Sequence, residues 1–239
     1  MSNQTKAWIR EDKPLFRIAV PQYLEETYWW AYLHPKAVNF FEQQWVINLI
    51  LWGNFSRLRD AALDELGKEI HGKILQVACV YGDFSVKLTE RLTNGASLDI
   101  VDVLFIQLEN VLRKVSHFEQ VRIMQSDSTK LKFEDGVYDQ VILFFLLHEM
   151  PLNVREKTLA EAIRVLKPGG KLVIVDYHLP SRLHPLRYIF KPVLKYLEPF
   201  AMDLWNKPIK SWFPANFVPS SLHQDTYFGG LYQKVVIKK

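Results

Sequence analysis

The sequence predicts an α/β fold with a doubly wound, mostly parallel sheet, and three observations support this prediction. Short apolar runs alternate with segments of helical periodicity between residues 71 and 178. The 239 residues are 49% hydrophobic and 23% charged, which is typical of an ordered globular protein. Polar residues follow the ends of several apolar runs, which is where parallel sheets bind their ligands. We therefore expect one large domain, or one domain with appended elements.

The predicted elements divide the chain into three parts. They are a helical N-terminal cap (1–70), a sheet core (71–178), and an amphipathic lid or membrane-contact segment with the terminal strands of the core sheet (179–239). The cap is predicted to be helical because apolar residues recur at helical spacing from residue 37 to about 51, and again from 55 to 66.

Within the core, short buried runs bounded by turn residues predict the strands. We expect strands at 73–79, 97–102, 121–125, 138–147 and 171–176. Segments of helical spacing lie between them, including one at 153–166. Strands that alternate with helices at this spacing are typical of β-α-β units, whose consecutive strands are parallel.

The charge balance is small and uneven. Thirty basic and 26 acidic residues give a net charge of +4, too small to indicate a nucleic-acid partner, and we expect none. The positive surplus belongs to residues 178–239. The single cysteine, Cys79, fits a reducing compartment. The apolar stretch 45–52 is far shorter than the roughly 20 residues that a spanning helix needs, and we expect neither a membrane span nor a secretory signal.

The segment 166–176, LKPGGKLVIVD, combines a helix end, a Pro-Gly-Gly turn and a buried strand. Among these neighbours it resembles the class I S-adenosylmethionine-dependent methyltransferases, which have a Rossmann-like fold, over roughly residues 70–180. The resemblance implies that Asp102 accepts hydrogen bonds from the cofactor ribose and that Asp127 with Ser128 holds the adenine amino group. Taken alone, each Asp could instead be a solvated loop residue or a helix cap.

The first predicted strand departs from the pattern of that family. The family normally has an acidic residue followed by two or three glycines, whereas this chain has QVACVYGD at 76–83. Ala78 and Val80 carry Cβ atoms where the family has none, and a β-branched residue does not readily adopt a positive φ. The residues expected at the cofactor here are Gln76, Ala78, Tyr81 and Gly82.

This altered run, together with YWWAY at 28–32, the 45–52 stretch and LHEMP at 147–151, resembles the rhodoquinone biosynthesis proteins, which are methyltransferase-like. The resemblance implies conversion of ubiquinone to rhodoquinone, in which an amino group replaces a ring methoxy group. It further implies that S-adenosylmethionine supplies the amine and that manganese assists. Two other functions stay open: a methyltransferase acting on a lipophilic quinone precursor, and a non-catalytic protein of this fold that binds lipid or a partner.

Candidate catalytic and metal-binding residues follow the fourth and fifth predicted strands. Hard cations such as Mn²⁺ favour carboxylate and imidazole ligands. His148 and Glu149 follow the fourth strand, while Asp176 and His178 end the fifth, so the four can share one crevice if those strands are neighbours. We expect Tyr81, His148 and Glu149 to be catalytic, and Glu149, Asp176 and His178 to bind the metal. Alternatively, Glu149 caps the next helix and His178 is an ordinary edge histidine.

The segment 184–199 has an apolar stripe at helical spacing and cations on another face. This pattern suits either a lid packed on the sheet or contact with a membrane interface. Prolines at 185, 192 and 199 predict a kinked or broken helix. We expect a cytoplasmic protein, peripherally associated with a bacterial inner membrane or, in a eukaryote, with the mitochondrial inner membrane.

Overall fold

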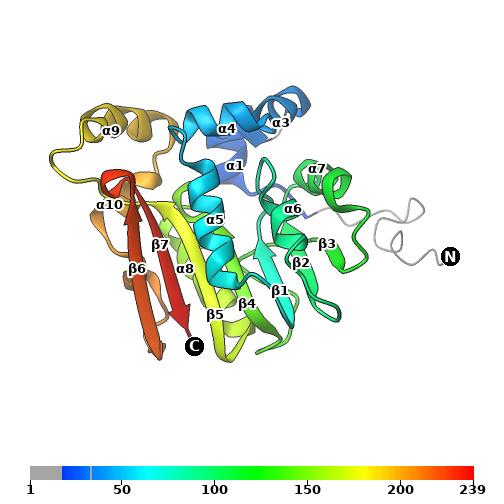
Figure 1. The fold of residues 1–239 in the computed structure, drawn as a ribbon. Helices are drawn as coiled ribbons and strands as arrows, with labels where there is room; N and C mark the ends of the chain where they lie inside the picture. The colour runs from blue at the N-terminus through cyan, green and yellow to red at the C-terminus, as the bar shows by residue number, and fades with distance from the viewer. Residues whose placement is uncertain (1–17, 33) are drawn as a thin grey trace.

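The computed structural model describes residues 18–32 and 34–239, and within these ranges seven strands form one sheet in the order β3-β2-β1-β4-β5-β7-β6 (Figure 1). The strands are β1 (Lys73–Val77), β2 (Ser97–Asp102), β3 (Val121–Gln125), β4 (Tyr138–Phe144), β5 (Leu166–Tyr177), β6 (Ser221–Tyr227) and β7 (Tyr232–Lys238). Neighbouring strands pair in parallel, except that β7 is antiparallel to both β5 and β6. The prediction of a doubly wound, mostly parallel sheet is therefore confirmed.

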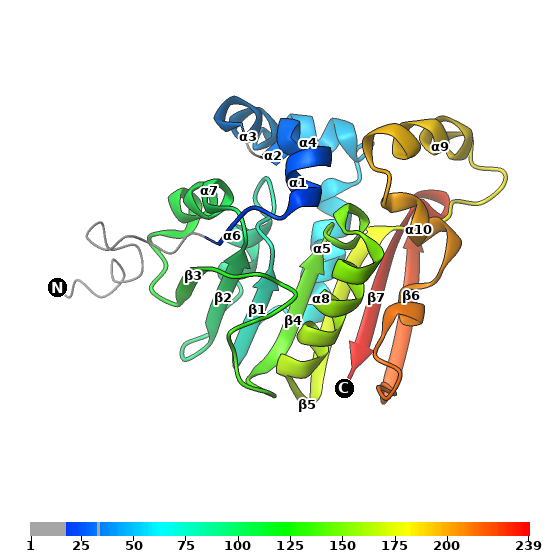
Figure 2. The same ribbon diagram turned by 180° about the vertical axis from the view of Figure 1, so that it is seen from behind.

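Helices cover both faces of this sheet and the edge at which its parallel strands end (Figures 1 and 2). The α-helices are α1 (Gln22–Thr27), α2 (Trp29–Tyr32), α3 (Pro35–Phe41), α4 (Gln44–Ile50), α5 (Phe55–Leu66), α6 (Phe84–Thr89), α7 (Phe105–Val115), α8 (Leu152–Val165), α9 (Leu186–Leu197) and α10 (Ala201–Asn206). Short 3-10 helices are η1 (Leu147–Glu149), η2 (Ile209–Trp212) and η3 (Phe228–Gly230). Helix α5 packs on one face and α8 on the other, while α1–α4 and α9 lie over the carboxyl edge.

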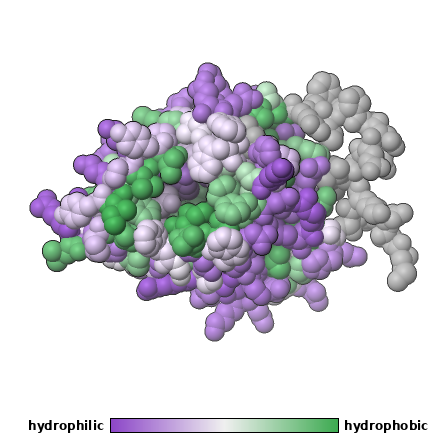
Figure 3. Space-filling model, turned by 90° about the horizontal axis from the view of Figure 1, so that it is seen from above, coloured by the Kyte–Doolittle hydropathy of each residue, from purple (hydrophilic) through white to green (hydrophobic). Residues whose placement is uncertain are grey.

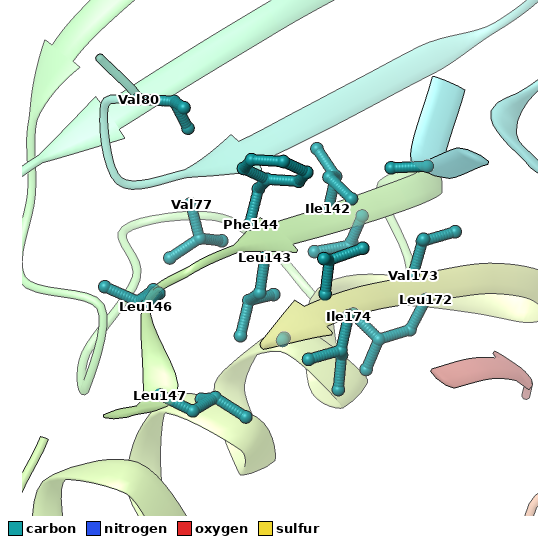
Figure 4. Close-up of a cluster of buried hydrophobic side chains, with 14 of the residues drawn as sticks. Val77, Val80, Ile142, Leu143, Phe144, Leu146, Leu147, Leu172, Val173 and Ile174 are labelled. Atoms are coloured by element: carbon teal, nitrogen blue, oxygen red, sulfur yellow. The ribbon is translucent and has the colours of Figure 1, made fainter. Parts of the chain in front are cut away.

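The core is built from β-branched and leucine side chains of the central strands. Figure 4 shows Val77 of β1, Ile142 and Phe144 of β4, and Val173 and Ile174 of β5 packed in one cluster. All five are buried, with at most 3% of their surface exposed. Because the three central strands are fixed by this packing, the loops that follow them are held at defined positions along one edge.

Several expected elements differ in the structure. The first strand ends at Val77 rather than at residue 79, and the fifth begins at Leu166 rather than at residue 171. The periodic stretch 37–51 forms two helices, α3 and α4, separated by a turn at residues 42 and 43. The fourth strand ends at Phe144, since Phe145 adopts a φ of +53° and turns the chain into η1. Helix α9 is one element across Pro192, so the expected break is absent. Pro185 and Pro199 lie just outside this helix, where proline is tolerated.

The N-terminal part of the expected cap, residues 1–17, lies outside the described residues. Among the described residues, no helix is long and apolar enough to cross a bilayer.

Candidate functional site

A cavity of about 1140 Å³ lies at the carboxyl edge of the sheet, beneath α1–α4 and α9. This volume exceeds the range of about 300–1,000 Å³ that is typical of a site for one small ligand. Seven of the expected site residues line it: Ala78, Tyr81, Asp102, Asp127, Ser128, His148 and Glu149. Gln76, Gly82, Asp176 and His178 do not line it. The strand ends thus converge on one cavity large enough for two ligands.

Asp102, at the end of β2, is held by backbone donors from two loops. Its Oδ2 accepts a hydrogen bond from the Cys79 N–H at 2.7 Å, and its Oδ1 accepts one from the Leu104 N–H at 2.8 Å. Burial raises the pKa of this carboxyl to about 6, against the effect of the N–H donors. A carboxylate accepts about four hydrogen bonds, and the backbone donors occupy part of this capacity.

The loop after β1 keeps the backbone shape of a glycine-rich turn without most of the glycines. Ala78 adopts a φ of +69°, a left-handed conformation that costs a non-glycine residue roughly 1–2 kcal/mol. Val80 does not adopt a positive φ. Gln76 donates to the Ala78 carbonyl at 3.0 Å and accepts from Ser85 Oγ at 3.0 Å. Gln76 therefore stabilises the loop through these two hydrogen bonds. The resemblance implied instead that Gln76 contacts the cofactor.

Gly82 lies where α4 of the cap packs against this loop. Its φ is +77°, and a Cβ built there would lie 2.9 Å from Ile47 and 3.0 Å from the Gln44 side chain of α4. Its carbonyl accepts a hydrogen bond from Lys114 Nζ at 2.8 Å. A side chain here would displace the ends of the Ile47 and Gln44 side chains, and the positive φ independently favours glycine.

The loop after β3 contributes polar side chains to the lining of the same cavity. Asp127 Oδ1 accepts hydrogen bonds from the Thr129 N–H at 2.8 Å and from Thr129 Oγ1 at 2.7 Å. Ser128 Oγ pairs with Thr158 Oγ1 at 2.9 Å. Ser126 Oγ is buried in the cavity lining with no partner among the described residues. This hydroxyl therefore has hydrogen-bonding capacity left for a ligand or an ordered water molecule.

Tyr81 joins the loop to the cap. Its hydroxyl donates to the Ala31 carbonyl at 3.0 Å and accepts from Gln107 Nε2 at 2.7 Å. Its ring stacks on that of Tyr32, with centroids 5.8 Å apart and 13° between the planes. Burial raises the pKa of Tyr81, which keeps the phenol neutral. These contacts place Tyr81 in the wall of the cavity, and its catalytic role stays a prediction.

His148 and Asp176 form a buried pair between β4 and β5. His148 Nδ1 lies 2.9 Å from Asp176 Oδ1, and Asp176 also accepts from the backbone N–H groups of Leu147 and Tyr177, both at 2.8 Å. Burial by itself would lower the pKa of His148, but the charge of Asp176 and the hydrogen bond outweigh it and raise that pKa to about 9. His148 is therefore a charged hydrogen-bond donor at neutral pH.

Glu149 lies beside this pair under the cap. One of its oxygens accepts a hydrogen bond from the Tyr32 hydroxyl of α2, and His148 Nε2 lies 3.7 Å from Glu149 Oε1. Burial raises the pKa of Glu149 to about 8, although the charge of His148 opposes the rise. Glu198, at the end of α9, also faces the cavity, and its Oε2 is buried without a partner among the described residues. Burial raises the pKa of Glu198 as well.

The metal-ligand set Glu149, Asp176 and His178 does not converge. Within residues 18–32 and 34–239, no three His, Cys, Asp or Glu side chains are grouped as a metal site. Asp176 is fully buried by its donors, and His178 points instead to the Gly230 carbonyl, with Nδ1 2.8 Å from that oxygen. The residues present therefore do not fit a bound manganese ion.

Arg155 of α8 is a positioning residue that the sequence pattern did not single out. It is fully buried and donates to the carbonyls of Leu147, the first residue of η1, and Met150, just after η1, at 3.0 and 2.9 Å. It also donates to the Phe200 carbonyl at 2.9 Å, just after α9. Arg155 thus ties the segment that carries His148 and Glu149 to the base of α9. Tyr32, Gln107 and Glu198 were likewise not anticipated, because their roles depend on contacts between distant segments.

Comparison with known proteins adds the family and the fold. Residues 45–217 match the model of the ubiE/COQ5 methyltransferase family. A demethylmenaquinone methyltransferase from Staphylococcus saprophyticus is 28% identical over 160 residues, which are 67% of this chain and 66% of the relative. The match therefore spans slightly less than two thirds of that relative.

Solved structures of similar fold include an S-adenosylmethionine-dependent methyltransferase from Aquifex aeolicus, with a TM-score of 0.53, 19% identity, and coverage of 86% of this chain and 98% of that one. The N-methyltransferase NodS from Bradyrhizobium japonicum, in complex with S-adenosylhomocysteine, gives a TM-score of 0.52 at 14% identity and covers 77% of this chain and 87% of its own. At these identities the likeness concerns the fold alone. Because the family model matches most of its length, the chain belongs to the ubiE/COQ5 methyltransferase family.

Proposed function

We propose that this protein is an S-adenosylmethionine-using transferase that modifies the ring of a lipophilic quinone-class substrate, and that the reaction is methyl transfer. The observation that carries the proposal is one cavity that is lined by Asp102, Ser126 and Asp127, by the ionisable His148 and Glu149, and by many apolar side chains. The family membership and the quinone substrate named for the staphylococcal relative support the same reaction.

The residues at the β1–β3 end fit a bound nucleoside cofactor. Asp102 has free acceptor capacity for ribose hydroxyls, and the unpaired Ser126 hydroxyl beside Asp127 suits an adenine edge. When bound, S-adenosylmethionine supplies an electrophilic methyl group. Ala78, whose left-handed backbone shapes the loop, forms the wall between this end and the cap.

The β4–β5 end supplies acid–base groups for the ring. The charged His148, oriented by Asp176, donates a hydrogen bond to a ring oxygen through its free Nε2. Glu149, with a pKa of about 8, accepts the proton that the ring loses when a carbon substituent replaces hydrogen. A general base with a pKa near the working pH contributes about 10²–10⁴-fold to such a step.

Amination of ubiquinone to rhodoquinone is a second candidate, favoured by the altered 76–83 run, in which Gln76 and Ala78 stand where the wider family has an acidic residue and a glycine. No step is assigned to manganese in this candidate, because no convergent ligand set exists among the described residues. On either reaction the protein meets its substrate by peripheral contact with a membrane.

One experiment distinguishes these functions. The protein is incubated with a short-chain demethylated quinol or with a short-chain ubiquinone, and with S-adenosylmethionine carrying ¹³C in the methyl group and ¹⁵N in the amino group. Mass spectrometry of the product then shows ¹³C for methyl transfer and ¹⁵N for amination. Neither label in the product, with no calorimetric binding of S-adenosylhomocysteine, would overturn both and leave the non-catalytic alternative.

A further inference from the structure

Most of the large apolar side chains that are exposed among the described residues lie in two segments, 29–52 and 188–197. We call them together the apolar rim. Its members are Trp29, Trp30, Phe40, Trp45, Leu49, Ile50 and Trp52 of the cap, and Tyr188, Ile189, Val193, Tyr196 and Leu197 of α9. Exposure of so many large apolar groups on one face is unusual for a protein surrounded only by water.

The two parts of the rim meet around the mouth of the cavity. Ile50 and Trp52 on one side, and Ile189, Val193 and Leu197 on the other, are both exposed and in the cavity lining. The rings of Trp52 and Phe190 join the two parts, with centroids 5.9 Å apart. Figure 3 looks down on this face and shows apolar groups around a hollow. A ligand that enters the cavity here passes between apolar side chains from both segments.

Positive charge flanks the rim on the α9 side. Residues 179–197 contain Arg182, Arg187, Lys191 and Lys195 and no acidic residue. Arg182, Lys191 and Lys195 are exposed. Cations beside exposed apolar and aromatic groups match the interface of a bilayer with anionic head groups, where each cation contributes about 1 kcal/mol. Trp and Tyr favour the same depth, because their rings combine an apolar body with a polar atom.

We propose that the apolar rim is a membrane-docking surface that places the cavity mouth against the acyl chains of an anionic bilayer. The proposal rests on the proposed function only in assigning a lipophilic substrate to the cavity. The apolar side chains of α2–α4 and α9 enter the interface, and the cations of α9 contact lipid phosphates. A quinone with a long isoprenoid tail then reaches the site without passing through water, while its tail stays in the bilayer.

The test is flotation of the purified protein with phosphatidylcholine vesicles, with and without phosphatidylglycerol. Trp45 and Tyr196 are 60% and 78% exposed and do not line the cavity. The double variant Trp45→Asp/Tyr196→Asp is expected to lower binding to both kinds of vesicle by about tenfold or more. Lys191→Glu/Lys195→Glu is expected to lower binding about tenfold on anionic vesicles only. Val218→Asp, an exposed apolar residue outside the rim, is the matched control and is expected to bind as the native protein does.

Two results would overturn the proposal. One is a native protein that does not float with either kind of vesicle. The other is a dimer in light scattering that Trp45→Asp/Tyr196→Asp dissociates, because the rim would then be covered by a second copy. Turnover of a water-soluble short-chain quinone distinguishes failure of the docking proposal from failure of the proposed function, because this substrate needs no membrane. If the variants lose only docking, they still turn over the short-chain quinone. If the native protein binds vesicles but turns over no quinone, the proposed function is wrong and the docking proposal stands.

Discussion

Two buried carboxylates at opposite ends of the cavity are held in different ways. Asp102 is fixed by backbone N–H groups from Cys79 and Leu104, both in loops of the sheet core. Glu149 receives a hydrogen bond from a cap side chain, Tyr32, which is 117 residues away in the chain. Burial raises both pKa values, to about 6 and about 8 respectively. The difference is that Asp102 is held by donors within the sheet core, whereas one hydrogen bond to Glu149 comes from the cap.

The strongest test of this division is Glu149→Gln. We expect turnover to fall by about 10²–10⁴-fold, because the variant cannot accept a proton. Affinity for S-adenosylhomocysteine, measured by calorimetry, is expected to stay within about twofold. Glu156→Gln, on the exposed side of α8, is the control. Retained turnover would show that the acid–base role lies elsewhere, with Glu198 as the next residue to change.

Asp102→Asn tests whether the carboxylate that is held by the sheet core binds the cofactor. Hydrogen bonds to a charged group contribute about 1.5–3 kcal/mol each, so loss of the carboxylate is expected to weaken S-adenosylhomocysteine binding about a hundredfold. The melting temperature is measured in parallel, because the Cys79 and Leu104 N–H groups also lose part of their acceptor. Asp225→Asn, at the edge of the sheet, is the control. Unchanged affinity would place the nucleoside away from β2.

The pH dependence of stability tests the burial of Glu149. The pKa of Glu149 is about 8 in the folded protein, whereas the ordinary pKa of a glutamate is 4.5. The contribution of this group to stability is therefore fully present below pH 4.5 and is lost as the pH rises through 8. The melting temperature of Glu149→Gln is expected to rise relative to the native protein by several degrees between pH 5 and pH 8. The contribution of His148, lost between its ordinary 6.5 and about 9, is shared by both proteins to first order. A constant difference across this range would mean that water reaches the carboxyl.

The smallest effect is expected for Ala78→Gly, beside Asp102. Glycine relieves the left-handed strain of roughly 1–2 kcal/mol but loses about 0.5–1 kcal/mol through a more flexible unfolded chain. We expect a net stabilisation of about 0–1.5 kcal/mol by chemical denaturation. Ala61→Gly, inside α5, has no such strain and is expected to destabilise by about 1 kcal/mol. Equal losses in the two variants would show that the Ala78 conformation is not strained.

Much of the core could be predicted from the sequence because its signals are local. Helix α5 and strands β2 and β3 begin and end at the predicted residues. Their boundaries are set by neighbouring turn residues such as Gly67 and by periodicity. The positions of Asp102 and His148 follow from the same logic, since strand ends fix them on one edge.

The rest of the site depends on contacts that no local pattern encodes. The positive φ of Phe145 depends on packing between β4 and β5, where its N–H donates to the Val175 carbonyl at 2.8 Å. Tyr32 and Glu198 reach Glu149 and His148 only because the cap and α9 close over the sheet. The expected metal ligands do not converge because of tertiary contacts as well. The carboxylate oxygens of Asp176 accept hydrogen bonds from backbone N–H groups.

The hydrogen bond between Tyr32 and Glu149 joins α2 of the cap to η1, which follows β4. Two segments that lie 117 residues apart in the chain are therefore held together by one hydrogen bond. Loss of the Tyr32 hydroxyl would leave the buried Glu149 carboxyl without this donor, and an unpaired polar group in a buried position costs about 1–3 kcal/mol.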